Sequence, residues 1–145
     1  MTVAAVLKQK GASIISVGPN TSCVKLAEII TAQRIGALVV MDDENALIGI
    51  VSERDVVKAI AQHREKALTL TAADMMTPKP VVASPETSVD EAMEMMDQGY
   101  FRHLPVIRDG KPAGIISIRD LVKYRIMQHQ NDVESLTSYV YRAGT

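Results

Sequence analysis

The chain contains one stretch of sequence twice, and this duplication restricts the folds that it can adopt. Residues 49–55 (GIVSERD) return as residues 114–120 (GIISIRD), and residues 19–22 (PNTS) return as residues 85–88 (PETS). Between these blocks the second copy is one residue shorter, at a polar turn where a deletion is tolerated. A repeat of this kind encodes one supersecondary unit per copy. The chain is therefore predicted to fold as two similar units.

Each copy shows the same order of elements: strand, helix, strand, strand, helix. Thr21-Ser22 and Thr87-Ser88 are good N-cap residues, and apolar side chains follow them with the spacing of one helical face. Apolar runs separated by a polar turn predict two strands after that helix. The strands are predicted over 14–17, 38–41 and 47–51 and over 81–83, 104–107 and 113–116, and the closing helices over 53–62 and 118–129. The fold class is α/β, in the α+β sense, with β-α-β-β-α written twice.

The predicted elements divide the chain into five parts. They are an N-terminal helical arm (1–13), a first repeat (14–62), a linker with a short helix (63–80), a second repeat (81–129), and a C-terminal helix and tail (130–145). The polar stretch 63–70 is predicted as a mobile loop, and Pro78 ends the short helix. Both terminal arms lie outside the repeats. Because neither repeat has enough apolar surface alone, the two are expected to pack face to face around one shared core.

Composition argues against several classes of function. The 145 residues include 16 basic and 17 acidic ones, a net charge of -1, which does not suit binding to nucleic acid or to an anionic membrane. No apolar run is long enough to span a membrane, no signal peptide is evident, and Cys23 is the only cysteine, so the cytoplasm is expected. The three histidines lack metal-ligand spacing, and no catalytic motif occurs, so neither a metal site nor an enzyme is predicted.

The repeated Ser-x-x-Asp has two compatible interpretations. At the start of a helix, Ser and Asp cap backbone N–H groups reciprocally, and for a lone copy this structural interpretation is the better one. The same junction also offers free N–H donors for a phosphate, an Asp for ribose hydroxyls and a neighbouring Arg for phosphate. Apolar strand residues supply a slot for a flat base. Capping alone does not explain Gly49 and Gly114, or the Arg that precedes Asp in both copies.

The duplicated arrangement resembles a CBS-domain pair, or Bateman module. The resemblance rests on residues 35–40 with 49–55 in the first copy, on residues 101–106 with 114–120 in the second, and on the lead-in 74–78 (DMMTP). It implies two repeats packed with pseudo-twofold symmetry, plus terminal helices, and two clefts between the repeats that take adenine nucleotides. It also implies a homodimer formed through the repeat helices.

The resemblance implies a set of nucleotide-binding residues as well. Asp55 and Asp120 would hold ribose hydroxyls, with Ser52 and Ser117 beside ribose or phosphate. The phosphate contacts expected from it are Arg54, Arg119, Arg102 and His103, although packing is an equal alternative for the histidine. The base slots expected from it are Val17, Val40 and Ile50 in the first cleft and Val82, Val106 and Ile115 in the second. The clefts are not equivalent, because the second copy has Arg102, His103 and Pro105 where the first has Gly36, Ala37 and Val39.

These features predict a non-catalytic regulatory module that senses an adenine nucleotide. AMP, ATP and NAD(H) are the candidate ligands, no cofactor is required, and the regulated partner is an effector protein of open identity. The nucleotide would shift the packing of the two repeats or of the terminal helices. The alternative is a ligand-free scaffold for protein–protein interaction, in which Asp55 and Asp120 act only as helix caps.

Overall fold

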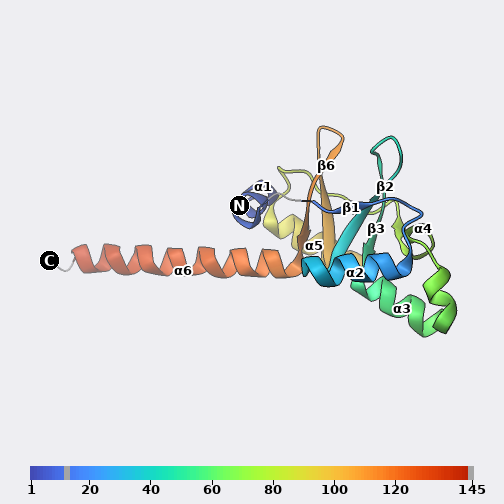
Figure 1. Cartoon of the computed structure of the whole chain (residues 1–145). Coiled ribbons are helices and arrows are strands. Elements are labelled where there is room, and N and C mark those ends of the chain that lie inside the picture. The colour runs from blue at the N-terminus through green and yellow to red at the C-terminus, as the bar shows by residue number, and fades with distance from the viewer. Residues whose placement is uncertain (12–13, 144–145) are drawn as a thin grey trace.

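The computed structural model describes residues 1–11 and 14–143 and contains two similar units, of which the first has the full predicted order and the second lacks the first strand. The first unit consists of β1 (Ser16–Val17), α2 (Cys23–Gln33), β2 (Ala37–Met41), β3 (Leu47–Ser52) and α3 (Glu53–His63). The second consists of α5 (Val89–Gly99), β5 (His103–Arg108), β6 (Lys111–Ser117) and α6 (Ile118–Ala143). The two β-hairpins stand side by side, with helices at one end of them (Figure 1). The predicted α/β class with two repeats is confirmed.

The two repeats differ in their sheets. The first repeat contributes β1, β2 and β3 to a sheet of four strands that β4 (Thr77–Pro78) completes, with β1 parallel to β2 and the other pairs antiparallel. Within the described residues, the second repeat has only the β5-β6 pair. The strand predicted over 81–83 is wrong, since Ala83 alone makes an isolated parallel bridge, to Val106. Pro80 and Pro85 flank this segment and lack amide donors, which limits the hydrogen bonds it can make.

The hydrophobic core is divided in two, which corrects the expectation of one shared core. Leu26 and Leu38 belong to a buried cluster inside the first repeat, whereas Leu104 and Ile116 belong to a separate cluster inside the second. Each hairpin therefore turns one face to the helices of its own repeat. Along β2 and β5 alternate residues point to opposite faces, and contacts between β2 and β6 join the two repeats.

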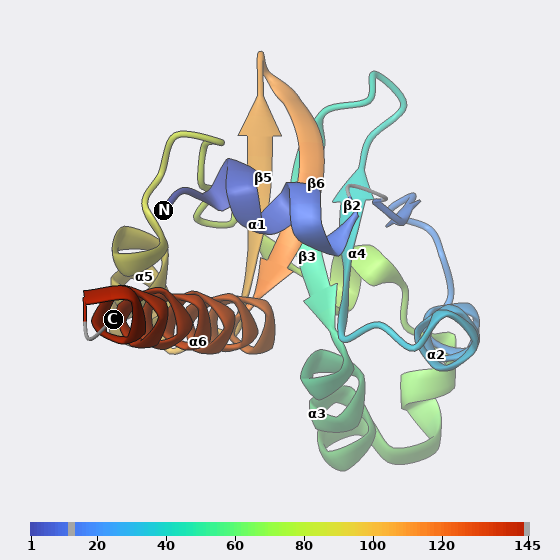
Figure 2. The ribbon, with the colours of Figure 1, turned by 90° about the vertical axis from the view of Figure 1, so that its left-hand side faces the viewer.

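The segment ahead of each repeat packs into the other repeat. α1 (Val3–Lys10) precedes the first repeat, yet Val3 and Leu7 belong to the core of the second, and the Val3 amide donates to Thr87 O at 2.8 Å. Likewise α4 (Ala72–Met75) precedes the second repeat and packs in the core of the first, where the Ala72 amide donates to Thr21 O at 2.8 Å. Figure 2 shows α1 lying across β5 and β6. α1 confirms the helix predicted for the N-terminal arm, and it packs into the core of the second repeat, a contact that the sequence analysis did not predict.

The two glycines that capping left unexplained make room for these exchanged segments. A Cβ built on Gly49 would lie 2.9 Å from Cγ of Met76, which follows α4. A Cβ built on Gly114 would lie 2.8 Å from Cδ2 of Leu7 on α1. Both distances are shorter than a normal carbon–carbon contact. Gly49 and Gly114 are therefore explained by packing.

The connection between the repeats is more regular than predicted. η1 (Arg64–Thr69) is a 3-10 helix that follows α3 directly, and its Ala67 is fully buried. The Cys23 amide donates to Leu70 O at 3.0 Å, which ties the end of this segment to the start of α2. The prediction of an irregular loop over 63–70 is wrong for residues 64–69, because the small apolar side chain of Ala67 allows this 3-10 helix to pack on the first core.

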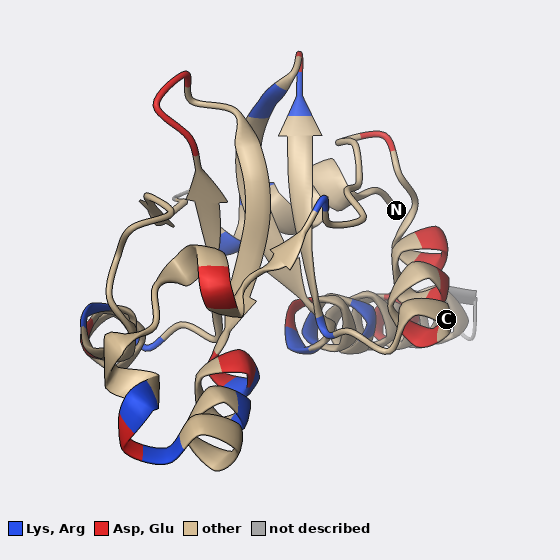
Figure 3. Cartoon of the chain, turned by 90° about the vertical axis from the view of Figure 1, so that its right-hand side faces the viewer, with Lys and Arg blue, Asp and Glu red and all other residues tan. Residues whose placement is uncertain are grey.

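α6 is one continuous helix of 26 residues, where the sequence analysis separated a helix from a helical tail. No Gly or Pro interrupts it. Leu121 packs in the second core, and Arg125 forms an ion pair with Asp90 on α5, a helix that carries several acidic residues (Figure 3). From residue 129 to residue 141 every side chain is exposed, and this part of α6 projects away from the rest of the molecule (Figure 1).

Candidate functional site

The two repeated junctions between a strand and a helix have the same local geometry. At the start of α3, the Ser52 amide donates to Asp55 Oδ2 at 2.8 Å, and the Asp55 amide donates to Ser52 Oγ at 3.3 Å. At the start of α6, the Ser117 amide donates to Asp120 Oδ2 at 2.8 Å, and the Asp120 amide donates to Ser117 Oγ at 3.1 Å. The capping interpretation of both motifs is confirmed.

The first N–H group of each of these helices donates to the residue just before the first hairpin strand of the same repeat. The Glu53 amide donates to Gly36 O, and the Ile118 amide donates to Arg102 O, each at 2.9 Å. The second amide of each helix, that of Arg54 or Arg119, has no hydrogen-bond acceptor among the residues that the structure describes. Each junction can therefore offer one backbone donor to an anionic group, in the partial positive field of a helix N-terminus.

Lys10 joins the second junction, which the sequence analysis did not anticipate. Its Nζ donates to Asp120 Oδ2 and to Ile115 O, each at 2.6 Å. Burial by itself raises the pKa of Asp120, but the hydrogen bonds from Lys10 and from the Ser117 amide outweigh it and hold that pKa below its usual value. Asp120 therefore remains a carboxylate at neutral pH.

One sequence signal points to this lysine in retrospect. Thr2 precedes α1 as Thr71 precedes α4, and each begins a short helix that inserts into the other repeat. The sequence analysis treated the first of these segments as an arm outside the repeats and assigned it no contact. Without the exchange of segments, nothing in the sequence places the last residue of α1 beside Asp120.

His103 lies where the two repeats meet. A Cβ built on Gly36 would lie 2.6 Å from His103 Nε2, so the glycine just before β2 leaves the space that the imidazole occupies. Burial lowers the pKa of His103, and the positive charges of Lys10 and Arg102 lower it further, against the opposite effect of Glu53 and Asp120. His103 is therefore neutral at neutral pH, and both repeats contribute to its surroundings.

The residues expected to form the base slots do not share one face. In the β2-β3 ladder, Val40 lies opposite Gly49 while Ile50 lies opposite Val39. Val40 is fully buried in the first core, and Ile50 on the opposite face is only partly buried. Because neighbouring residues along a strand point to opposite sides, Val40 and Ile50 cannot line the same surface.

The second repeat shows the same division. Val106 is fully buried in the second core, and Ile115, which lies opposite Pro105, is partly buried on the other face. Val39 and Pro105 lie on the same strand faces as Ile50 and Ile115, which point away from the core of each repeat, and both are buried. The sequence analysis did not select them as base-slot residues. In the first repeat Val17 pairs with Val40 on β2, and in the second repeat Ala83 pairs with Val106 on β5. The structural equivalent of Val17 is therefore Ala83, and the choice of Val82 was wrong by one residue. The side chain of Val82 is 40% exposed.

The three arginines proposed as phosphate contacts, Arg54, Arg102 and Arg119, are exposed at the junctions. Among the described residues they form no ion pair, and no group of His, Cys, Asp and Glu is arranged to hold a metal ion. No helix within the described ranges is long and apolar enough to cross a membrane.

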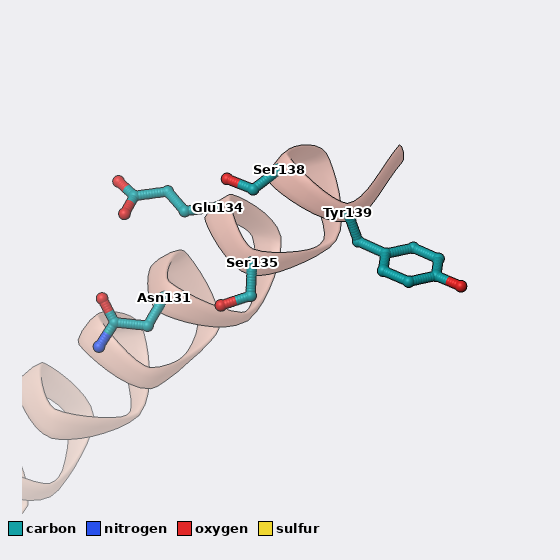
Figure 4. Close-up of a pocket in the computed structure, with 5 residues that line it drawn as sticks. All are labelled: Asn131, Glu134, Ser135, Ser138 and Tyr139. Carbon is teal, nitrogen blue, oxygen red and sulfur yellow. The ribbon is translucent and has the colours of Figure 1, made fainter. Parts of the chain in front are cut away.

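A surface depression lies away from the junctions, on the projecting part of α6 (Figure 4). It is lined by Asn131, Glu134, Ser135, Ser138 and Tyr139. All five come from one helix with exposed side chains, so no second element closes over this surface. It does not coincide with the junctions or with His103.

Comparison with known proteins identifies the repeats. The sequence profile of the CBS domain matches residues 11–62 and again residues 72–126. A curated relative, the mitochondrial CBS domain-containing protein CBSX3 of Arabidopsis thaliana, is 31% identical over 147 aligned positions, covering 96% of this chain and 71% of the relative.

Solved structures agree with the fold. The CBS-domain containing protein ATU1752 from Agrobacterium tumefaciens superposes with a TM-score of 0.83 at 40% identity, covering 86% of this chain and 99% of that one. CBSX2, solved in complex with AMP, gives 0.71 at 26% identity, with 88% and 98% covered. The CBS domain pair of MJ0100, solved with 5-methylthioadenosine and S-adenosyl-L-methionine, gives 0.76 at 25% identity, with 86% and 98% covered.

Proposed function

The chain belongs to the CBS-domain family, and on that premise we propose that it is a non-catalytic regulatory module that binds an adenine nucleotide between its repeats. The observation that carries the proposal is the junction at the start of α6. There Asp120, Lys10 and the Arg119 amide, which has no acceptor among the described residues, lie together where the two repeats meet. A carboxylate for ribose and donors for phosphate are the two polar requirements of a nucleotide.

In the second cleft, Asp120 accepts hydrogen bonds from the ribose hydroxyls. Its Oδ2 is engaged by Ser117 and Lys10, and Oδ1 accepts no hydrogen bond from the described residues. The phosphate meets the Arg119 amide and guanidinium, together with Arg102. Ser117 and His103 border the ribose, and Ile115 contacts the base. Val106 supports the slot from within the core, and Val82 borders its open side.

In the first cleft, the equivalent residues are Ser52, Arg54 and Asp55, with Ile50 beside the base, while Val40 and its strand partner Val17 support the slot from within the first core. Asp55 accepts hydrogen bonds only from Ser52 among the described residues. Gly36 takes the position that Arg102 occupies in the second repeat. We propose that this cleft binds nucleotide more weakly, since it offers fewer cationic groups.

The relatives support adenine compounds as the ligand class. One solved neighbour holds AMP, and another holds 5-methylthioadenosine and S-adenosyl-L-methionine. AMP, ATP and NAD(H) are the candidates for this chain. A nucleotide can regulate only if it binds one arrangement of the repeats better than another. The contact of His103 with Gly36 joins the two repeats and is the element whose packing the nucleotide would shift.

Thermal unfolding of the full chain with a panel of adenine compounds tests the proposal. A ligand at a hundred times its dissociation constant adds about 2.7 kcal/mol to the free energy of unfolding, which raises Tm by several degrees. We expect at least one nucleotide to raise Tm in the wild type and to lose this effect in Asp120→Ala. If no compound raises Tm, the nucleotide-binding function is rejected.

The second candidate function is a ligand-free scaffold for protein–protein interaction. The observation in its favour is that the capping boxes already account for Ser52, Ser117 and the two aspartates. Val57 and Ile60 are exposed one turn apart on α3, and such a face fits the proposed homodimer through the repeat helices. Sedimentation of the wild type and of Val57→Lys, with and without nucleotide, separates the two functions. The scaffold requires a dimer that nucleotide does not alter.

The remaining parts of the proposal concern location and partners. The single cysteine and the near-neutral charge support a cytoplasmic protein that acts on an effector protein, with no nucleic-acid or membrane partner. One relative is named as mitochondrial. Fractionation of cells that express the tagged chain tests this location.

A further inference from the structure

We propose that Lys10 makes the second cleft selective for adenine nucleotides that carry a 5′-phosphate over adenosine compounds that lack one. This inference rests on the proposed function and names the ligand class of the same site. Lys10 reaches the junction from α1, a segment that precedes the first repeat, and its Nζ bonds Asp120 Oδ2 and Ile115 O at 2.6 Å each.

The ammonium group of Lys10 is held in place and is still open to a ligand. A lysine has three N–H donors, and two of them are used by Asp120 and Ile115. The side chain of Lys10 is 37% exposed and that of Asp120 is 21% exposed, so the pair lies at the surface of the molecule and not within the core. One donor and one open side therefore remain for an additional acceptor.

A ribose on Asp120 changes the hydrogen bonds of Lys10. Ribose hydroxyls that donate to Oδ1 share the negative charge of the carboxylate with the ammonium group on Oδ2, so ligand binding weakens the hydrogen bond between Lys10 and Asp120. A phosphate on the ligand supplies a new anionic acceptor for the lysine, as phosphate groups do for lysines in other nucleotide sites. A ligand without a phosphate weakens the hydrogen bond between Lys10 and Asp120 and offers the ammonium group no new acceptor, which costs binding free energy.

The surrounding charges strengthen the same preference. Arg102 and Lys10 both act on His103 as positive charges, and His103 itself is neutral because burial lowers its pKa. Glu53 and Asp120 are the acidic groups that face it. Asp120 is matched by Lys10, so the exposed Arg102 and Arg119 leave the junction with a positive excess toward solvent.

The first cleft lacks this lysine and provides an internal comparison. Lys79 follows α4 as Lys10 ends α1, but its backbone amide donates to Ile48 O at 3.2 Å and its side chain makes no hydrogen bond or ion pair with the described residues. Asp55 is therefore not paired with a lysine. Selectivity for phosphate is expected in the second cleft and not in the first.

Titration calorimetry with AMP and with adenosine, on the full-length wild type and on Lys10→Met, tests the proposal. Methionine keeps the length of the side chain and removes the charge. We expect the wild type to bind AMP at least tenfold more tightly than adenosine. We expect Lys10→Met to lose about tenfold in AMP affinity, or about 1.4 kcal/mol, and to bind adenosine within threefold of the wild type. Lys8→Met, an exposed lysine on the same helix, is the matched control and leaves both affinities unchanged.

The possible results distinguish the two claims. If Lys10→Met weakens AMP and adenosine equally, or neither, the phosphate role of Lys10 is overturned while nucleotide binding stands. If the wild type binds neither compound nor any other adenine nucleotide, both the proposed function and the proposed role of Lys10 are rejected. Thermal unfolding without ligand shows whether Lys10→Met is folded, and Lys10→Arg, which retains a cation, should preserve the preference for AMP.

Discussion

Asp55 and Asp120 each use Oδ2 to accept a hydrogen bond from the backbone amide just before the helix, while Oδ1 accepts none from the described residues. The same side chain therefore caps a helix and still presents an oxygen to a ligand. Of these two aspartates, only Asp120 has a cationic partner among the residues that the structure describes, namely Lys10. This difference at single residues separates two junctions whose backbone geometry is the same.

The ionisation of Asp120 predicts a pH dependence of stability. Its pKa is held below the usual value in the folded chain, so the unfolded chain binds a proton at a higher pH than the folded chain does. The carboxylate therefore stabilises the fold above a pH of about 4, and this contribution is lost as pH falls through the folded pKa. Urea unfolding should show Asp120→Asn less stable than the wild type at pH 6, with the difference shrinking toward pH 3.

The control for this series is Asp43→Asn, at an exposed turn. Its free energy of unfolding should stay close to that of the wild type across the same range. A gap between Asp120→Asn and the wild type that is constant from pH 6 to pH 3 would show that the carboxylate charge is not responsible.

At the scale of elements, the segments packed on β3 and β6 require glycine at positions 49 and 114. Each glycine lies on a strand beneath an exchanged segment, where a Cβ would press on Met76 or on Leu7. Gly49→Ala should destabilise the fold by about 1–3 kcal/mol, as overpacking of a core does. Combining it with Met76→Ala should recover part of the loss, because the smaller side chain makes room. A double-mutant cycle from urea unfolding measures this coupling.

Gly18→Ala is the matched control, since nothing lies within 4 Å of a Cβ at that position. It should cost well under 1 kcal/mol. If the losses in unfolding free energy caused by Gly49→Ala and Met76→Ala simply add, the contact with Met76 is not the reason that residue 49 is a glycine.

The elements that sequence predicts well are those with local causes. The caps at Ser22 and Ser88 and the polar turns place α2, α5 and the hairpins because each depends on residues a few positions apart. The exchange of α1 and α4 depends on contacts between distant parts of the chain, and so the packing of these two helices and the position of Lys10 were not predicted. The division of Val40 and Ile50 between two faces follows from strand register, which the motif alone does not specify.

At the scale of the whole molecule, the two repeats are joined by exchanged segments and by a contact between their hairpins. α1 completes the core of the second repeat, and α4 completes that of the first. Removal of α1 would therefore open the core of the second repeat, and removal of α4 would open that of the first. A ligand that binds at the end of α1 is in direct contact with the segment that holds the two repeats together.

This arrangement predicts that damage to α1 is felt in the second repeat. Leu7→Ala removes a side chain buried in the second core and should cost about 2–5 kcal/mol. Amide hydrogen exchange should rise in β5 and β6 more than in β2 and β3, although Leu7 precedes the first repeat in sequence. Met76→Ala should show the opposite distribution. Faster exchange confined to the first repeat in Leu7→Ala would contradict the exchange of segments.

The central claim is that an adenine nucleotide binds at the junction of β6 and α6, and amide chemical shifts in solution test it most directly. Titration of the isotope-labelled full chain with AMP should move the amides of residues 115–120 and of Lys10 and His103 most. The same amides should not respond in Asp120→Ala. No shift, or shifts confined to residues 131–139 on the projecting part of α6, would contradict the account and leave the ligand-free scaffold in its place.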